Sequence, residues 1–296
     1  MTSVPRDDAF TRAMPAVFVV IWSTGFIVAR YGMPYAPPMK FLALRYALSI
    51  LCFLPWIVLA RVAWPKTYAQ WLHLAVTGML MNGGYLGGVW AAIKAGMGSG
   101  LSSLIVGLQP VLTAVWLSGT GGQVTRRQWA GLTLGFAGLA LVVWRKLGQG
   151  GEADWMNLSL ACMALFSITA GTLYQKRFVA PCDVRSANAV LLGAALLVTL
   201  PFALLEHEPL HWNAELAGAM AWSVLALTLG GSSLLYMLIQ RGAVAAVTSL
   251  MYLVPPATAL MAWLLFAEPI TVVTLSGTAI TALGVSLVVR PAKLPA

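Results

Sequence analysis

Long apolar segments alternate with short polar breaks along nearly the whole chain. A helix that spans a membrane needs about 20 mostly apolar residues. The segments between charged residues and Pro/Gly breaks predict ten such helices, at residues 13–33, 39–60, 71–93, 99–118, 127–145, 156–176, 185–205, 217–239, 245–266 and 271–290. Only short connections remain between them, so we expect an all-α membrane protein with no soluble domain.

The composition supports this interpretation. Of the 296 residues, 59% are hydrophobic and 9% are charged, and the mean hydropathy is +0.82. A soluble domain carries about 25% charged residues, and a chain this apolar could not cover its surface with polar groups. An ordinary cytosolic enzyme, a secreted disulfide scaffold and a disordered chain are therefore excluded. Cys52, Cys162 and Cys182 have neither metal-ligand nor redox spacing, so we expect no metal and no cofactor.

The net charge of +9 comes from 18 Lys and Arg against 9 Asp and Glu. In a soluble protein this balance would suggest nucleic-acid binding, but basic residues in a membrane protein mark the cytoplasmic loops. With the N-terminus inside, the alternating spans place these basic residues inside: Arg6, Arg12, Arg61, Lys66, Arg126, Arg127, Lys176, Arg177, Arg185, Arg241, Arg290 and Lys293. The remaining ones fall outside: Arg30, Lys40, Arg45, Lys94, Arg145 and Lys146. This predicts a bacterial-type inner membrane protein with both termini cytoplasmic and no nucleic-acid partner.

The sequence also matches itself at an ungapped offset of 146 positions. Glycine and proline pairs carry the match: Gly25/Gly171, Pro55/Pro201, Gly84/Gly230, Gly96/Gly242, Pro110/Pro256, Gly131/Gly277 and Gly138/Gly284. Each half holds five spans, and an odd number makes the second half enter the membrane from the opposite side. Such inverted-topology repeats are typical of secondary transporters, which bind substrate between the halves. The predicted organisation is a tail at 1–12, repeats at 13–145 and 156–290 joined by a linker at 146–155, and a tail at 291–296.

Several short motifs point to a known group of transporters. They are Trp22-Ser-Thr-Gly-Phe26 with Arg30, Pro37-Pro38 with Leu44-Arg45-Tyr46, the stretch 96–110, Phe266-Ala-Glu268-Pro269, and Gly277 with Gly284. Together with the repeat, they make the chain similar to the drug/metabolite transporter superfamily, in its ten-span EamA-type branch. The resemblance implies export of amino acids, purines or other small metabolites, or passage of amphipathic drugs. One departure is visible, since Gly122 stands in the first half where Glu268 stands in the second.

Polar and aromatic residues near the middle of the spans are candidates for a substrate cavity. Gln109 precedes Pro110, and a proline frees backbone carbonyls. An amide beside freed carbonyls can bind a polar ligand, or it can merely satisfy the carbonyls. The other candidates are Trp22, Ser23 and Phe26 on one face of the first span, Asn82, Tyr85 and Trp90 in the third, Ser232 and Tyr236 in the eighth, and Tyr252 in the ninth.

Four charged residues form a second group of candidates, for a gate or a charge network. Arg45 lies about two turns inside its span, where a cation is costly unless it is paired or extends to the membrane surface. We expect Arg45 to extend outward, to order an outer gate, or to meet a substrate carboxylate. Arg30 and Lys94 could form a basic rim with it, and Glu268 lies at an outer turn.

The chain contains no ATP-binding P-loop, no paired carboxylates, no HExxH motif and no nucleophile elbow. A pump driven by ATP and an intramembrane protease are therefore disfavoured, and we do not expect an enzyme. The favoured function is a secondary transporter that exports small metabolites, above all amino acids, by alternating access, with lipids and substrate as its partners and no obligate protein partner. The alternatives are efflux of amphipathic cations and an intramembrane lipid-handling protein.

Overall fold

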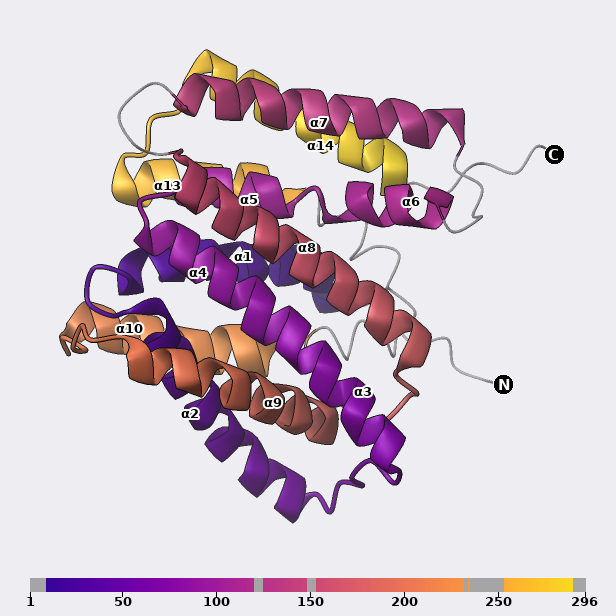
Figure 1. The fold of residues 1–296 in the computed structure, drawn as a ribbon, viewed down its shortest axis with the longest axis vertical. Coiled ribbons are helices and arrows are strands. Elements are labelled where there is room, and N and C mark those ends of the chain that lie inside the picture. The colour runs from indigo at the N-terminus through magenta and orange to yellow at the C-terminus, as the bar shows by residue number, and fades with distance from the viewer. Residues whose placement is uncertain (1–8, 120–124, 148–152, 232–233, 235–252, 290–296) are drawn as a thin grey trace.

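The structure is a computed structural model that describes residues 9–119, 125–147, 153–231, 234 and 253–289. Every regular element in this part of the chain is helical, and it contains no strand (Figure 1). The first half comprises α1 (Ala9–Gly32), α2 (Pro38–Leu59), α3 (Tyr68–Gly78), η1 (Met79–Gly84), α4 (Tyr85–Lys94), α5 (Ser99–Val106), α6 (Gln109–Gly119) and α7 (Arg126–Lys146). The second comprises α8 (Trp155–Phe178), α9 (Val184–Leu205), α10 (Ala214–Trp222), η2 (Ser223–Gly230), α13 (Val254–Phe266) and α14 (Val272–Val289).

These helices follow the predicted spans, with informative differences. α3, η1 and α4 run on without interruption as the third span, whereas the fourth span is broken into α5 and α6 immediately before Pro110. Parts of the eighth and ninth spans lie outside the described residues. Four described stretches are long and apolar enough to cross a membrane by themselves: Pro38–Leu59, Ser99–Trp116, Trp155–Phe178 and Val184–Leu205. Shorter apolar helices accompany them.

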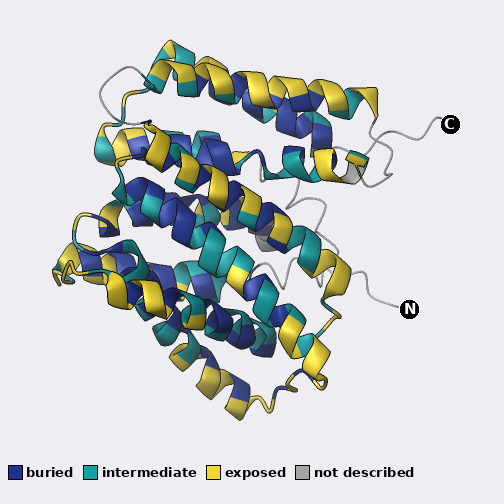
Figure 2. Cartoon of the chain, viewed as in Figure 1, coloured by how far each residue is buried: buried dark blue, intermediate teal, exposed yellow. Residues whose placement is uncertain are grey.

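Large apolar side chains lie on the outer faces of the bundle. Leu59, Trp144 and Val272 are about four-fifths exposed, and many other helical residues of the same kind are exposed (Figure 2). Water would penalise such a surface, whereas a bilayer's hydrocarbon core accepts it because each helix satisfies its own backbone groups. The predicted fold class, an all-α membrane protein, is confirmed.

The inverted repeat is visible in how α7 packs on α14. A Cβ atom added to Gly131 would lie 2.5 Å from the carbonyl oxygen of Gly284, and one added to Gly138 would lie 2.5 Å from that of Gly277. As one residue number rises the other falls, so the two helices are antiparallel. Shifting by 146 turns the first contact into the second. A pseudo-two-fold axis therefore passes between the helices, and only glycine permits this close approach.

The remaining helices obey the same symmetry. α2 packs against its equivalent α9, again antiparallel, since Glu206 at the end of α9 accepts from the backbone N–H of Met39 and Lys40 at the start of α2. α1 packs on α10 and α13 of the second half, and its equivalent α8 packs on α3 and α6, the equivalents of those two helices in the first. The two halves thus interlock, and their shared surface surrounds the axis.

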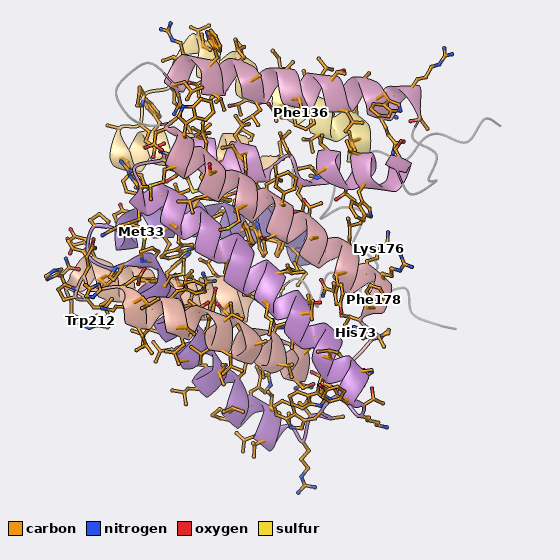
Figure 3. All side chains as sticks on the ribbon, in the orientation of Figure 1. Met33, His73, Phe136, Lys176, Phe178 and Trp212 are labelled. Atoms are coloured by element: carbon orange, nitrogen blue, oxygen red, sulfur yellow. The ribbon has the colours of Figure 1, made fainter. Side chains whose placement is uncertain are left out.

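Two ends of the bundle differ in charge. We call one the acidic end, because it carries Asp154, Glu206, Glu208, Glu215 and Glu268. The other is the basic end, which carries Arg61, Lys66, Arg126, Lys176, Arg177 and Arg185. In Figure 3, Met33 and Trp212 mark the acidic end, and His73, Lys176 and Phe178 lie toward the basic end.

Candidate functional site

A cavity of about 440 Å³ lies between the two repeats. Its wall is built by α1, α2, α3, η1 and α4 from the first half and by α8, α9, η2 and the loop at residues 179–182 from the second. Pockets for small molecules commonly have volumes of about 300–1,000 Å³. The cavity is therefore large enough for one small metabolite.

The wall is assembled from positions that the repeat relates. Each of these pairs is separated by 146 residues and both members line the cavity: Trp22/Ile168, Arg45/Leu191, Met81/Leu227, Asn82/Thr228 and Tyr85/Gly231. Two surfaces related by a pseudo-two-fold axis meet at that axis, which places the cavity on it. The symmetry is one of position and not of chemistry, because the paired side chains differ.

The third helix of each half has a π-helical segment beside the cavity. η1 (Met79–Gly84) and η2 (Ser223–Gly230) overlap after the shift of 146 residues, so the irregularity is itself repeated. The widened turns are held by side chains, since the Tyr46 hydroxyl donates to the Asn82 carbonyl oxygen at 2.7 Å and the Thr228 hydroxyl donates to that of Ser223 at 2.9 Å. Irregular turns of this kind often occur at functional sites.

Arg45 turns toward the cavity and does not extend to the membrane surface. It is 7% exposed, and its Nε and Nη2 atoms donate to the Thr228 hydroxyl at 3.3 and 3.2 Å. The contact joins α2 of one repeat to η2 of the other. Of the three positions expected for Arg45, the outward one is wrong. Lys94, expected to share a basic rim with it, donates to the Met33 carbonyl oxygen.

Packed aromatic rings separate the cavity from the acidic end. Trp90 lines the cavity and is 1% exposed, and its ring stacks on Phe41 with centroids 4.4 Å apart. None of the loops at 33–37, 95–98 and 206–213 contributes to the cavity wall. The described residues therefore close the cavity on this side.

Charged groups tie the loops of the acidic end together. Lys94 forms an ion pair with Glu208 at 2.7 Å and also donates to the Met33 carbonyl oxygen at 3.1 Å. The hydrogen bond and the charge of Lys94 hold the pKa of the exposed Glu208 carboxyl below its usual range. Lys40 donates to the backbone oxygen of Glu208 at 2.7 Å. The loop after α9 is thus bound to α2 and α4.

Glu268 has a structural contact at the same end. Ala267 adopts a left-handed conformation (φ 52°) after α13, which turns the chain so that Glu268 reaches the start of α5. Its carboxylate accepts from the backbone N–H of Ser99 at 3.0 Å and of Gly100 at 3.4 Å. Free N–H groups at a helix start favour a negative charge. Glu268 therefore joins the fourth span to the ninth and tenth, away from the cavity.

Toward the basic end the cavity reaches the loop between α8 and α9. Residues 179–182 line it, together with Gln175 and Asn188. Burial, and then the neighbouring Asp183, raise the pKa of the half-buried Cys182 thiol. Arg185 donates to Asp183 at 2.8 Å, and this bond lowers the pKa of the Asp183 carboxyl. The cavity thus extends as far as this loop.

The predicted cavity residues fall into three groups. Trp22, Phe26, Asn82, Tyr85 and Trp90 line the cavity. Ser23 and Gln109 do not: the buried Ser23 hydroxyl donates to the Val19 carbonyl oxygen at 2.7 Å, and the Gln109 amide donates to Thr172 at 2.8 Å. Ser232, Tyr236 and Tyr252 lie outside the described residues.

Sequence reasoning missed three polar residues of the wall, namely Gln175, Asn188 and Thr228. The repeat offset could have identified Thr228, which is the equivalent of Asn82. It gives no such signal for Gln175 and Asn188, whose equivalents are Ala29 and Leu42.

An apolar helical bundle of two inverted halves around a cavity of metabolite size defines a class, the multi-pass membrane transporters. The sequence pattern of the EamA-like transporter family matches this chain twice, at residues 14–144 and 155–290. The chain therefore belongs to the EamA-like transporter family of the drug/metabolite transporter superfamily, and the resemblance drawn from its motifs is confirmed.

Individual relatives agree with this assignment. A probable amino-acid metabolite efflux pump of Salmonella typhimurium is 27% identical over 67% of this chain and 63% of its own length, so the match spans less than two thirds of that protein. An uncharacterized transporter of Archaeoglobus fulgidus is 23% identical over 93% of this chain and 97% of its own. The uncharacterized inner membrane transporter YedA of Escherichia coli K12 is 24% identical over 70% and 66%, respectively.

One solved crystal structure has the same fold. It superposes with a TM-score of 0.66 at 18% sequence identity and covers 93% of this chain and 95% of its own. The relatives and the apolar helices together make this chain a multi-pass inner membrane protein.

Proposed function

We propose that this protein exports small metabolites, amino acids or related amphipathic solutes, by alternating access. The observation that carries the proposal is the cavity on the pseudo-two-fold axis, which is closed toward the acidic end and reaches the loop at 179–182 toward the basic end. In an inverted repeat, the halves can exchange conformations, and the exchange opens the opposite side.

The charge distribution supports an orientation. Cytoplasmic loops of membrane proteins are enriched in Lys and Arg, so we place the basic end, and both termini, in the cytoplasm. The described conformation is then inward-facing. A cavity open to the cytoplasm is the state in which an exporter loads its substrate.

The choice of substrate rests on two supports. The Salmonella relative is named an amino-acid metabolite efflux pump, and a cavity of about 440 Å³ suits a single amino acid. Amphipathic cations fit less well, because Arg45 is the charged side chain that the described residues contribute to the wall, and none of their Asp or Glu residues lines it. Transport, and not catalysis, is the activity that we assign.

Counterflow in proteoliposomes tests the proposal. Vesicles preloaded with an unlabelled amino acid should take up the same labelled amino acid, and Trp22→Ala and Tyr85→Ala should each lower the rate several-fold. Phe166→Ala removes a large aromatic side chain from an exposed face and should leave the rate unchanged. If no amino acid gives counterflow, and labelled lipid instead moves between leaflets, the protein handles lipids and the proposal is wrong.

A further inference from the structure

We propose that Arg45 binds an anionic group, a carboxylate, of the substrate, so that the transported molecules are amphipathic carboxylates. The inference rests on the proposed function and names its substrate class. In this arrangement the carboxylate lies against Arg45 of the first repeat, and the apolar part lies against the apolar side chains of the wall. Four observations carry it: the charge around Arg45, the geometry of its guanidinium, its burial, and the difference between the two halves of the wall.

Carboxylates that could neutralise Arg45 are engaged elsewhere or lie far along the chain. In the described residues Glu208 pairs with Lys94, Asp183 with Arg185, and Asp154 caps α8. Glu206 and Glu268 bind the backbone at the starts of α2 and α5. Glu215 lies in the first turn of α10, at the acidic end. The other three acids of the sequence, Asp7, Asp8 and Glu152, belong to the tail and to the connection between the repeats.

The segments of the second half that are not described cannot supply an acid either. Residues 232–233 and 235–252 contain neither Asp nor Glu. No membrane-spanning segment of this chain therefore has a carboxylate to offer to Arg45. In our proposal, the negative charge beside this guanidinium therefore comes from a molecule that enters the cavity.

The guanidinium has donors left for such a molecule. It has five N–H groups, of which the Nε and one Nη2 group point to the same acceptor, the Thr228 hydroxyl. The other N–H groups have no acceptor among the described residues. The Thr228 hydroxyl in turn donates its proton to the Ser223 carbonyl oxygen. This bond orients the hydroxyl so that the lone pairs of its oxygen face Arg45. The guanidinium plane is thus held in place while one of its edges stays free, and a carboxylate can accept two parallel hydrogen bonds from such an edge.

The burial of Arg45 favours the binding of an anion at this free edge. Arg45 is 7% exposed, and a cation within a membrane protein is costly unless an opposite charge or hydrogen bonds compensate it. Arginine suits this position better than lysine would, because its planar fork matches a carboxylate and is more weakly hydrated. A bound anion would compensate the free-energy cost of burying the Arg45 charge.

The two halves of the wall differ in a way that orients a ligand. Where the first repeat provides Trp22 and Arg45, the second provides Ile168 and Leu191 at the equivalent positions. Where the first provides Met81 and Tyr85, the second provides Leu227 and Gly231. The side chains from the second repeat are thus aliphatic or absent at four of the five paired positions. Gln175 and Asn188 of the second repeat also line the wall, toward the basic end. A ligand can therefore place a charged head beside Arg45 and an apolar body beside Ile168 and Leu227.

Three probes that share a phenylethyl group distinguish which polar group, carboxylate or amine, the site recognises. They are 3-phenylpropionate, which has only a carboxylate, L-phenylalanine, which has a carboxylate and an amine, and phenethylamine, which has only an amine. We expect both carboxylates to raise the melting temperature of the purified full-length protein and phenethylamine not to do so. Arg45→Gln should weaken the binding of phenylpropionate about tenfold or more, because it removes the charge-assisted hydrogen bonds.

Further variants test whether a loss of binding comes from the lost contact or from misfolding. Arg45→Lys retains the charge but loses the fork, and should bind with intermediate affinity. Thr228→Val releases the guanidinium and should also weaken binding, with Arg45 intact. Arg126→Gln removes a positive charge from the exposed start of α7 and should bind all probes as the wild type does.

The outcomes distinguish this inference from the function on which it rests. If the wild type transports labelled L-phenylalanine but binds phenethylamine as tightly as phenylpropionate, or if Arg45→Gln binds carboxylates as tightly as the wild type, the carboxylate site is wrong and transport stands. A carboxylate-specific shift without counterflow would support the site and contradict the transport proposal. If no probe shifts the melting temperature and none gives counterflow, both are wrong.

Discussion

The hydroxyl of Thr281 in α14 lies 3.4 Å from the carbonyl oxygen of Gly135 in α7, and these residues are 146 positions apart. They are equivalent positions of the two repeats, so the pseudo-two-fold axis passes between them. A glycine pair crosses on either side of this point. The pseudo-two-fold axis that passes through the cavity therefore also passes through the close contact between the backbones of α7 and α14.

We expect Gly138→Val to destabilise the α7–α14 pair. An added Cβ would lie 2.5 Å from the Gly277 carbonyl oxygen, and backbone cannot move aside as a flexible side chain can. Overpacking of this kind costs about 1–3 kcal/mol, which thermal unfolding of the purified protein would measure. Gly193→Ala in α9 is the control, because no atom lies within 4 Å of its added Cβ. An unchanged melting temperature for Gly138→Val would contradict the close crossing.

The Lys94–Glu208 pair should help to keep the acidic end closed. Lys94→Glu places two negative charges together, and we expect faster labelling of a cysteine at Met33, which is 3% exposed, by an impermeant thiol reagent. The double variant Lys94→Glu/Glu208→Lys should restore slow labelling. Because Lys94 lowers the pKa of Glu208, the pair should persist above the usual glutamate range and be lost as the pH falls below it. Equal labelling of all three proteins would show that the pair has no such role.

Cys182 should report whether the cavity is open toward the basic end. In a Cys52→Ser/Cys162→Ser background, maleimide should react with Cys182 slowly at neutral pH and faster as the pH rises, because burial and Asp183 raise the pKa of its thiol. Asp183→Asn should speed the reaction at a fixed pH. A transported amino acid should protect Cys182. Reaction that is fast at neutral pH and insensitive to Asp183→Asn would argue against the buried position.

Glu268 should stabilise the fold and take no part in proton coupling. Its carboxylate binds the start of α5, and a charge at a helix start contributes about 0.3–1 kcal/mol, which Glu268→Gln should lose in part. No span has an Asp, Glu or His near its middle, so a pH gradient alone should drive no net accumulation of a net-neutral amino acid in proteoliposomes. Concentrative uptake that disappears in Glu268→Gln would mean that this carboxylate carries the proton. Glu215→Gln, at the same end, is the control for the uptake measurement.

Labelling of single cysteines at the two ends of the bundle would show which end faces the cytoplasm. Cysteines that replace Lys66, Arg127 or Arg241 should resist impermeant reagents in intact cells, because the excess of basic residues marks these loops as cytoplasmic. Arg241 lies outside the described residues, so its result is independent of the structure. A cysteine at Trp212, which is exposed at the acidic end, should react. The reverse pattern would invert the orientation.

Much of the architecture was predictable because hydropathy is a property of consecutive residues. The apolar segments identified the spans, as the match between 156–176 and α8 (Trp155–Phe178) illustrates. The break between α5 and α6 lies just before Pro110, where backbone carbonyls were expected to be freed. The offset of 146 residues identified the repeat, since its glycines and prolines are constrained by backbone geometry. From an odd number of spans in each half, the inverted symmetry followed.

The position of individual side chains was not predictable in the same way. Ser23 lies one residue from Trp22 and was expected to share its cavity, yet it is buried and its hydroxyl bonds to its own helix. Consecutive side chains on a helix point in different directions, so Ser23 and Trp22 have different neighbours. For Arg45 the sequence left three positions open. The tertiary structure decided among them by bringing Thr228 of the second half within hydrogen-bond distance.

The sequence by itself thus determined the number, order and symmetry of the helices, since these depend on local hydropathy and on repeated backbone constraints. Only the tertiary structure decided which equivalent positions face one another, which end is closed by Trp90 and Phe41, and that Arg45 faces Thr228 while Leu191 takes its place in the other repeat. Such relationships join residues more than a hundred positions apart. They depend on how the two halves pack together, and no pattern within either half encodes that packing.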